Sequence, residues 1–95
     1  MINNFKIRVN TPEESIRVQK ALFKLGYYWY FNGKTVSHTN SPFLYAEKYY
    51  ILETTHISYG ISYGNKKNLF NKCPYPEMLV EEVEKLAESR GLRTK

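Results

Sequence analysis

The chain opens with a strict alternation of hydrophobic and polar side chains. Phe5, Ile7 and Val9 fall on one parity, and Lys6 and Arg8 fall on the other. A period of two is typical of a strand with one face in the core and one face in water. The pattern therefore predicts a half-buried first strand whose lysine and arginine point away from the core.

A helix follows, and capping residues mark its beginning. Thr11 is a good N-cap, Pro12 suits the first helical position, and Glu14 can complete a capping box. Gly26 supplies a C-terminal cap. Between these signals apolar residues recur at spacings of three and four, which predicts a helix that packs on the sheet. The apolar positions are Ile16, Val18, Ala21, Leu22 and Leu25.

The next segment, YYWYFNG, is aromatic at both strand parities. Tyr27, Trp29 and Phe31 form one set, and Tyr28 and Tyr30 form the other. A sheet in a small domain usually buries one face, so the second set needs a partner. We assign the bulkier set, which contains Trp29, to the core. We expect Tyr28 and Tyr30 to face a second layer that holds a ligand.

Further short strands are predicted in the centre of the chain. Asn32-Gly33 is a strong hairpin signal because both residues tolerate positive φ, and residues 34–37 are expected to return as the partner strand. Residues 42–46 and 49–55 are then predicted as two strands around a tight turn at residues 46–48. This part of the chain is expected to form a Tyr-rich antiparallel meander.

The segment ISYGISYG is an exact tetrapeptide duplication. Read as a strand, it has one bulky face and one nearly bare face. Glycine in a strand often marks close approach by a ligand or by another backbone. A strand packed against a second copy, or a flexible loop, explains the pattern equally well. The bulky residues are Ile57, Tyr59, Ile61 and Tyr63, and the bare face consists of Ser58, Gly60, Ser62 and Gly64.

A second helix is predicted at the end of the chain. Pro76 suits its first turn and Gly91 its C-terminal cap. Residues 1–95 are expected to form a single α+β domain with an antiparallel, Tyr-rich sheet of about five strands and two helices, in the order β-α-β-β-β-β-(β)-α. The apolar positions of this helix are Leu79, Val80, Val83, Leu86 and Ala87.

Length and charge indicate what such a domain can bind. A chain of 95 residues buries a modest share of its surface, so we expect it to self-associate. Residues 1–76 carry ten Lys and Arg against four acidic residues, a net charge of +6, whereas residues 77–95 carry four against five, a net charge of −1. The basic body attracts anions. The single cysteine and the absence of an apolar span favour a soluble, intracellular protein without membrane contact.

The sequence offers little for catalysis or metal binding. His38, His56 and Cys73 lie far apart in sequence, and no local motif ties any two of them together. A zinc site needs three or four ligands at close spacings, which these residues do not provide. We therefore expect no catalytic residues, no metal site and no cofactor.

Binding through aromatic and basic side chains remains. Tyrosine rings can stack on nucleotide bases while lysines and arginines hold phosphates. Arg17, Lys20 and Lys24 form a basic stripe on the first helix, which is either a solvated helix face or an anion-binding edge. The glycine-rich run before Lys66 and Lys67 is a weak anion cradle. The candidate ligand-binding residues are Tyr28, Tyr30, Tyr59, Gly60, Tyr63, Lys66, Lys67, Arg17, Lys20 and Lys24.

Several segments together resemble small phage and prophage proteins. These segments are a first strand, a Ser-x-x-x-Gln helix, the motif LF-x-LGY-x-W and a late Glu-rich helix, and ISYGISYG departs from the pattern. The resemblance implies a counter-defence protein of the host bacterial cytoplasm that acts by binding, for example by sequestering nucleotide immune signals such as cyclic ADP-ribose isomers or cyclic oligonucleotides. The matching residues are Ser15, Gln19, Leu22, Phe23, Leu25, Gly26, Tyr27 and Trp29.

Three functions fit these observations. The first is a non-enzymatic, self-associating protein that sequesters an anionic, nucleotide-like small molecule. The second is an inhibitor that binds a host protein through the same aromatic surface. The third is a single-stranded nucleic-acid binder, which the charge favours although no known nucleic-acid motif is present.

Overall fold

The computed structural model describes residues 4–30, 32–51 and 56–93, and these form a mixed α+β fold. Five strands and three helices follow one another in the order β-α-β-β-β-α-β-α. The elements are β1 (Phe5–Arg8), α1 (Pro12–Lys24), β2 (Tyr28–Trp29), β3 (Phe43–Ile51), β4 (His56–Gly64), α2 (Lys67–Lys72), β5 (Glu77–Met78) and α3 (Val80–Arg93). The α+β class is confirmed.

The sheet is mixed, so the prediction of an antiparallel sheet is wrong. Its strand order is β2-β4-β3-β1-β5. The two central pairs, β1–β3 and β3–β4, are antiparallel. The two edge strands are parallel to their neighbours, β2 to β4 and β5 to β1. Each parallel edge strand has only two residues, too short for a hydrophobic alternation that would reveal it in the sequence.

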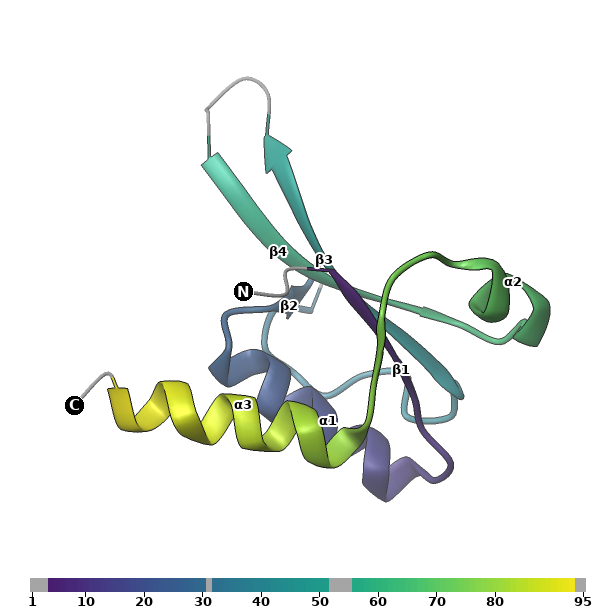
Figure 1. Ribbon diagram of the computed structural model, residues 1–95, viewed down its shortest axis with the longest axis horizontal. Coiled ribbons are helices and arrows are strands. Elements are labelled where there is room, and N and C mark those ends of the chain that lie inside the picture. The colour runs from purple at the N-terminus through teal and green to yellow at the C-terminus, as the bar shows by residue number, and fades with distance from the viewer. Residues whose placement is uncertain (1–3, 31, 52–55, 94–95) are drawn as a thin grey trace.

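Helices α1 and α3 lie together along one face of the sheet, and the main core lies between them and the strands (Figure 1). The first predicted strand and its apolar parity are confirmed, because Phe5 and Ile7 are fully buried and Val9 is nearly so. Tyr27 and Trp29 are buried as predicted, whereas Phe31 lies outside the described residues. Further core residues are Val18, Leu22, Leu44, Ala46, Ile61, Val80, Val83 and Ala87.

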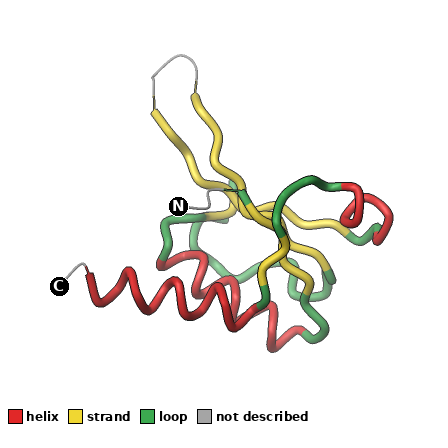
Figure 2. Tube along the Cα trace, viewed as in Figure 1, coloured by secondary structure: helices red, strands yellow, loops and turns green. Residues whose placement is uncertain are grey.

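The opposite face of the sheet, called the outer face below, is partly covered by α2 (Figure 2). The Phe70 ring is fully buried there and stacks on Phe43 at 4.5 Å between ring centroids. Lys6 points away from the main core as predicted, but it is buried, with 8% of its surface exposed. Its Nζ donates to the carbonyl oxygens of Phe70 at 2.6 Å and Cys73 at 3.0 Å, so the ammonium caps the C-terminal end of α2.

The capping prediction for α1 is confirmed. Thr11 Oγ1 accepts a hydrogen bond from the Glu14 backbone N–H at 3.1 Å. The Glu14 carboxylate returns to the N–H of Asn10 at 2.9 Å, one residue earlier than a standard capping box. Gly26 follows the helix with φ of 101°, the left-handed conformation expected of a C-terminal cap.

Two predictions for the middle of the chain are wrong. Residues 34–37 are not a strand, because the backbone of Ser37 bonds to the Gln19 side chain instead of to a neighbouring strand. The two strands predicted around residues 46–48 are one continuous strand, β3, which pairs with β4 from Phe43 to Ile51. Residues 52–55 lie outside the described part of the chain. The duplicated segment is a strand, as one of its interpretations required.

The C-terminal predictions hold only in part. Helix α3 begins at Val80, not at Pro76, because the residues between them form β5 beside β1. Leu79 is 59% exposed and Gly91 lies inside the helix, so neither has its predicted role. Helix α2 was not predicted, since its six residues are too few to show a helical hydrophobic repeat.

Candidate functional site

The most promising hollow lies at one edge of the sheet, where the short strand β2 ends. It has a volume of about 210 Å³ and a largely aromatic wall. We call it the ring pocket. Its lining residues are Trp29, Tyr30, Asn32, His38, Ile61, Ser62 and Tyr63.

Three rings of the pocket are packed against one another. His38 stacks on Tyr63 with 3.9 Å between ring centroids and 15° between planes. Trp29 meets both rings at steep angles, at 5.0 Å from His38 and 6.2 Å from Tyr63. Trp29 is 4% exposed, whereas Tyr63 is 46% and Tyr30 is 76% exposed. The pocket therefore has a fixed aromatic floor and open aromatic rims, an arrangement suited to a flat ring.

A buried glutamine holds this wall in place. Gln19 of α1 has no exposed surface. Its Oε1 accepts hydrogen bonds from the Trp29 indole N–H and the Ser37 backbone N–H, both at 2.9 Å. Its Nε2 donates to the Ser37 carbonyl at 2.7 Å and to Ser15 Oγ at 2.9 Å. Every hydrogen-bond donor and acceptor of the Gln19 side chain therefore has a partner, in α1, in β2 or in the loop that carries His38.

The backbone around the pocket is shaped by two turns. Trp29 and Gly33 exchange backbone hydrogen bonds at 2.8 and 2.9 Å, and Gly33 has φ of 60°. The chain therefore reverses here, but the predicted two-residue turn is wrong, because Gly33 pairs with Trp29 instead of lying with Asn32 at the centre of a hairpin turn. His38 has φ of 53°, a conformation that is uncommon for residues other than glycine. Its carbonyl accepts from the Ser41 N–H at 3.1 Å, which closes the turn that brings the imidazole to Tyr63.

Only two of the predicted ligand-binding residues, Tyr30 and Tyr63, line the ring pocket. Tyr59 packs edge-on against Tyr27 at 5.3 Å, on the helix-covered face. Tyr28 pairs with Gly60 on the outer face, where its hydroxyl shares a 2.5 Å hydrogen bond with the Ser58 hydroxyl.

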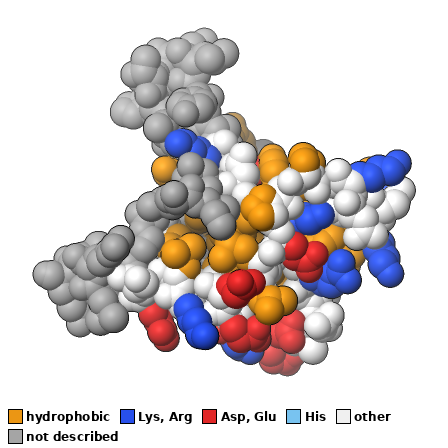
Figure 3. Space-filling view, viewed as in Figure 1, with side chains coloured by type: hydrophobic (Ala, Val, Ile, Leu, Met, Phe, Trp, Pro, Cys, Tyr) orange, Lys and Arg blue, Asp and Glu red, His pale blue; other side chains and the backbone are white. Residues whose placement is uncertain are grey.

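The predicted cations lie elsewhere. Lys66 and Lys67 are exposed at the beginning of α2, and Figure 3 shows Lys and Arg side chains gathered at that end of the molecule. Arg17, Lys20 and Lys24 line a groove between α1 and α3 with a volume of about 190 Å³. None of these five residues is among the described residues that line the ring pocket.

The groove between α1 and α3 is partly neutralised by acidic side chains. Arg17 donates two hydrogen bonds to Glu84, at 2.6 and 3.2 Å. These bonds lower the pKa of the Glu84 carboxyl below its ordinary value. Glu88 also lines the groove. The basic stripe is therefore better described as a helix face paired with acidic residues than as an open anion site.

The small residues of β4 (Ser58, Gly60, Ser62 and Gly64) are on the outer side of the sheet, next to side chains of β3. A Cβ atom added to Gly64 would lie 3.4 Å from the Tyr45 ring. Nearby, Glu47 accepts hydrogen bonds from the Tyr75 hydroxyl at 2.6 Å and the Ser62 hydroxyl at 3.2 Å. The bond to Glu47, with burial and the carboxylate charge, raises the pKa of Tyr75 to about 12. Gly64 thus lies against a tyrosine of the neighbouring strand at a distance that a small side chain could also accept.

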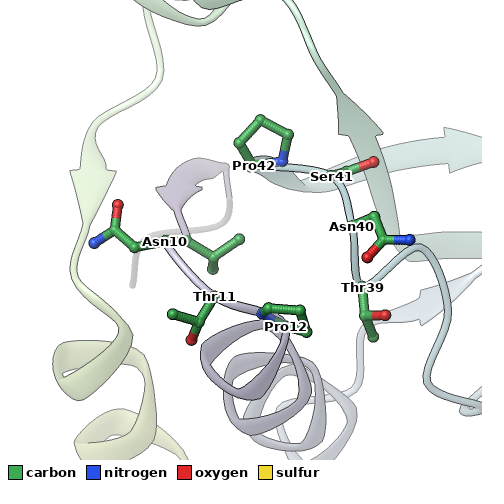
Figure 4. Close-up of a pocket in the computed structure, with 8 residues that line it drawn as sticks. Asn10, Thr11, Pro12, Thr39, Asn40, Ser41 and Pro42 are labelled. Carbon is green, nitrogen blue, oxygen red and sulfur yellow. The ribbon is translucent and has the colours of Figure 1, made fainter.

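A further hollow of about 150 Å³ lies between the beginning of α1 and residues 39–42 (Figure 4). Its lining includes Asn10, Thr11 and Asn40 and carries no charged side chain. The Thr11 hydroxyl already caps the helix. The arrangement serves the helix start and gives no further sign of a ligand.

Sequence reasoning missed Trp29, Asn32 and His38 as members of one site. Trp29 was assigned to the core, which is correct, but its buried ring also forms the pocket floor. The signal that was present in the sequence is Gln19, a polar residue between the apolar positions of α1. A buried amide needs partners, and its partners here are the pocket residues.

Other kinds of site find no support in the described residues. Over that part of the chain, no three His, Cys, Asp or Glu side chains come close enough to hold a metal ion. Likewise, none of the helices described is both long and apolar enough to cross a membrane. Comparisons with protein-family models, curated proteins and solved structures find no match to this chain.

Proposed function

We propose that the chain binds the flat ring of a nucleotide-type small molecule in the ring pocket and holds it without chemical conversion. The observation that carries the proposal is the stacked pair of His38 and Tyr63 beside the highly exposed ring of Tyr30. A base stacked on an aromatic side chain gains about 1 to 3 kcal/mol. Apolar walls with a few polar groups are typical of small-ligand sites.

Charge supports an anionic ligand at long range rather than by direct contact. Among the described residues of the pocket, His38 is the one whose side chain can carry a positive charge. The net +6 of residues 1–76, from ten basic and four acidic residues, still attracts anions to the molecule as a whole. The phosphates of the ligand then remain at the pocket mouth, in solvent.

The biological setting in this proposal is counter-defence. The resemblance to small phage proteins supports it, since one class of such counter-defence proteins sequesters nucleotide signals of bacterial immunity. Cyclic ADP-ribose isomers and cyclic oligonucleotides combine flat bases with negative charge, the two properties that the ring pocket and the basic body favour. Sequestration needs affinity and no catalytic group.

The test uses Trp29, the single tryptophan of the chain, as an intrinsic reporter on the pocket floor. Titration with the four nucleoside 5′-monophosphates and with cyclic dinucleotides should quench or shift its fluorescence. Tyr30→Ala should weaken binding by about 1 to 3 kcal/mol. Tyr28→Ala, an adjacent tyrosine on the outer face, is the matched control and should leave the affinity of the folded protein unchanged. Loss of binding only with Tyr28→Ala would place the ligand on the outer face instead.

Single-stranded nucleic acid is the second candidate, because the same exposed rings and the same net charge suit it. Salt separates the two candidates. Polynucleotide affinity should fall steeply and log-linearly with salt concentration, because phosphate contacts release counterions. A small ligand held mainly by stacking should lose little affinity over the same range. A steep slope with an oligonucleotide and no response to mononucleotides would favour the second candidate.

A further inference from the structure

The ring pocket contains one amide whose orientation is fixed by its neighbours. Asn32 Nδ2 donates to Ser37 Oγ at 3.0 Å, and that hydroxyl in turn donates to the Thr35 carbonyl at 2.9 Å. Since a hydroxyl has one proton, Ser37 Oγ can only accept from Asn32. The atom of Asn32 that faces Ser37 must therefore be nitrogen, and the side-chain oxygen must lie on the other side.

Ser37, which holds the Asn32 amide, is itself hydrogen-bonded to a buried residue of the core. Both backbone groups of Ser37 bond to the buried Gln19 side chain, which also holds Trp29. The position of Ser37 is thereby tied to helix α1 and to the pocket floor. Asn32 itself is exposed and lines the pocket. Within the described part of the chain, its Oδ1 accepts no hydrogen bond, and one N–H of its amide is not used.

We propose that Asn32 reads the edge of the bound ring and selects an adenine-type base. Its Oδ1 accepts a hydrogen bond from the exocyclic amino group, and its remaining N–H donates to the neighbouring ring nitrogen. An asparagine amide matches the N6 donor and N7 acceptor of adenine in this way. The inference rests on the proposed function, because it assigns specificity to the same pocket.

The choice of adenine follows from combining stacking with this edge. A bicyclic base covers more of the Tyr30 and Tyr63 rings than a single-ring base, and stacking grows with the covered surface. Among purines, adenine presents a donor beside an acceptor on the edge that carries N7, whereas guanine presents two acceptors there. The lone oxygen of Asn32 would face an acceptor in that case, which is unfavourable.

The experiment compares two ligands that differ only in the amino group. Adenosine 5′-monophosphate and purine riboside 5′-monophosphate are titrated into the unmodified protein, and Trp29 fluorescence is followed. The adenosine ligand should bind about tenfold more tightly, since a matched amide pair contributes discrimination of this size. This comparison does not depend on the folding of any variant.

Variants then assign the preference to its residue. Asn32→Ala should abolish the preference, because both ligands then lose the hydrogen bond to the ring nitrogen and adenosine 5′-monophosphate also loses the one from its amino group, so that the two bind equally and more weakly. Asn32 does not have positive φ, so alanine is not strained there. Asn68→Ala, an exposed asparagine of α2, is the matched control and should keep the preference.

The outcomes separate the two proposals. Equal affinity of the two ligands for the unmodified protein, or a preference that survives Asn32→Ala, would overturn the role of Asn32 and leave ring binding intact. If neither these ligands nor any other ring compound changes the fluorescence of Trp29, ring binding and the adenine preference both fall.

Discussion

At the scale of single residues, Gln19 shows how one buried polar group can organise a site. It lies among the apolar positions of α1 and is completely buried, yet each of its side-chain atoms has partners. The sequence alone predicted the apolar face of this helix correctly. It could not predict Trp29 and Ser37 as partners of Gln19, because these residues lie ten and eighteen positions away, one in the two-residue strand β2 and the other in irregular backbone.

Replacing this glutamine should therefore be costly. In Gln19→Leu the Trp29 indole N–H and the Ser37 backbone groups lose their partners, and each buried polar group left unpaired costs about 1 to 3 kcal/mol. We expect a loss of about 3 kcal/mol in the free energy of unfolding, measured by denaturant titration. Lys20→Leu changes the exposed neighbour and should stay within about 0.5 kcal/mol. Equal effects of the two changes would show that the network contributes nothing particular.

The pair of Tyr75 and Glu47 predicts a response to alkaline pH. The pKa of Tyr75 is raised from its ordinary 10.0 to about 12, chiefly by its hydrogen bond to Glu47. The folded state therefore favours the protonated phenol, so its contribution to stability is complete below pH 10 and is lost as the pH rises towards 12. Chemical unfolding across this window should show the loss, and Tyr75→Phe should reduce it. A loss of equal size in that variant would contradict the assignment.

At the scale of elements, local signals predicted what local interactions determine. The first strand and α1 carry alternation, spacing and caps within their own sequence, and both were predicted correctly. Strands β2 and β5 were not predicted in their observed pairing, because each consists of two residues held by a distant neighbour. The continuous strand β3 was divided in two because Ala46, Glu47 and Lys48 resemble a turn when their pairing with β4 is unknown.

Helix α2 illustrates an element stabilised by one side chain. Phe70 is fully buried against Phe43 and beneath the Lys6 ammonium, whereas Leu69 of the same helix is 55% exposed. Phe70→Ala should lower the free energy of unfolding by about 3 to 5 kcal/mol. Leu69→Ala, the matched control, should change it by less than about 0.5 kcal/mol. Thermal or denaturant unfolding measures both, and a small effect of Phe70→Ala would show that α2 contributes little to the fold.

At the scale of the whole molecule, the residues predicted to form one binding site lie in several separate places. The sequence proposed aromatic residues as candidate binding groups, and two of them, Tyr30 and Tyr63, line the same pocket. The predicted lysines and arginines belong to α1 and α2, away from the lining of the ring pocket. Neighbours in space are set by the strand order, and the parallel pairing of β2 with β4, which brings Trp29 beside Ile61, leaves no local trace in the sequence.

The incomplete pairing at the ends of β3 and β4 leads us to expect that the chain self-associates. Strand β1 pairs with β3 only from Phe43 to Ala46, and β2 pairs with β4 only at Gly60 and Ile61. Among the described residues, the outer parts of β3 and β4 therefore form a ribbon without a third strand, which projects from the body in Figure 1. A two-stranded ribbon alone is marginally stable in water, and its edges can accept a further strand. On the β3 side the Lys48 N–H already donates to Asn4 Oδ1 at 2.7 Å, so we expect the β4 side, at residues 56–59, to take part in pairing.

A second copy of the chain can satisfy those edges, because strand pairing between identical ribbons adds backbone hydrogen bonds and completes a wider sheet. We expect a dimer or larger assembly in sedimentation experiments at micromolar concentration. Amide hydrogen exchange of residues 56–59 should slow as the protein concentration rises, whereas exchange within α1 should not change. Tyr30→Ala should leave the association unchanged, since Tyr30 lies at the ring pocket and not on the ribbon. A monomer at every concentration tested, with exchange of residues 56–59 independent of concentration, would mean that the ribbon is stable alone and would remove the reason for an assembly.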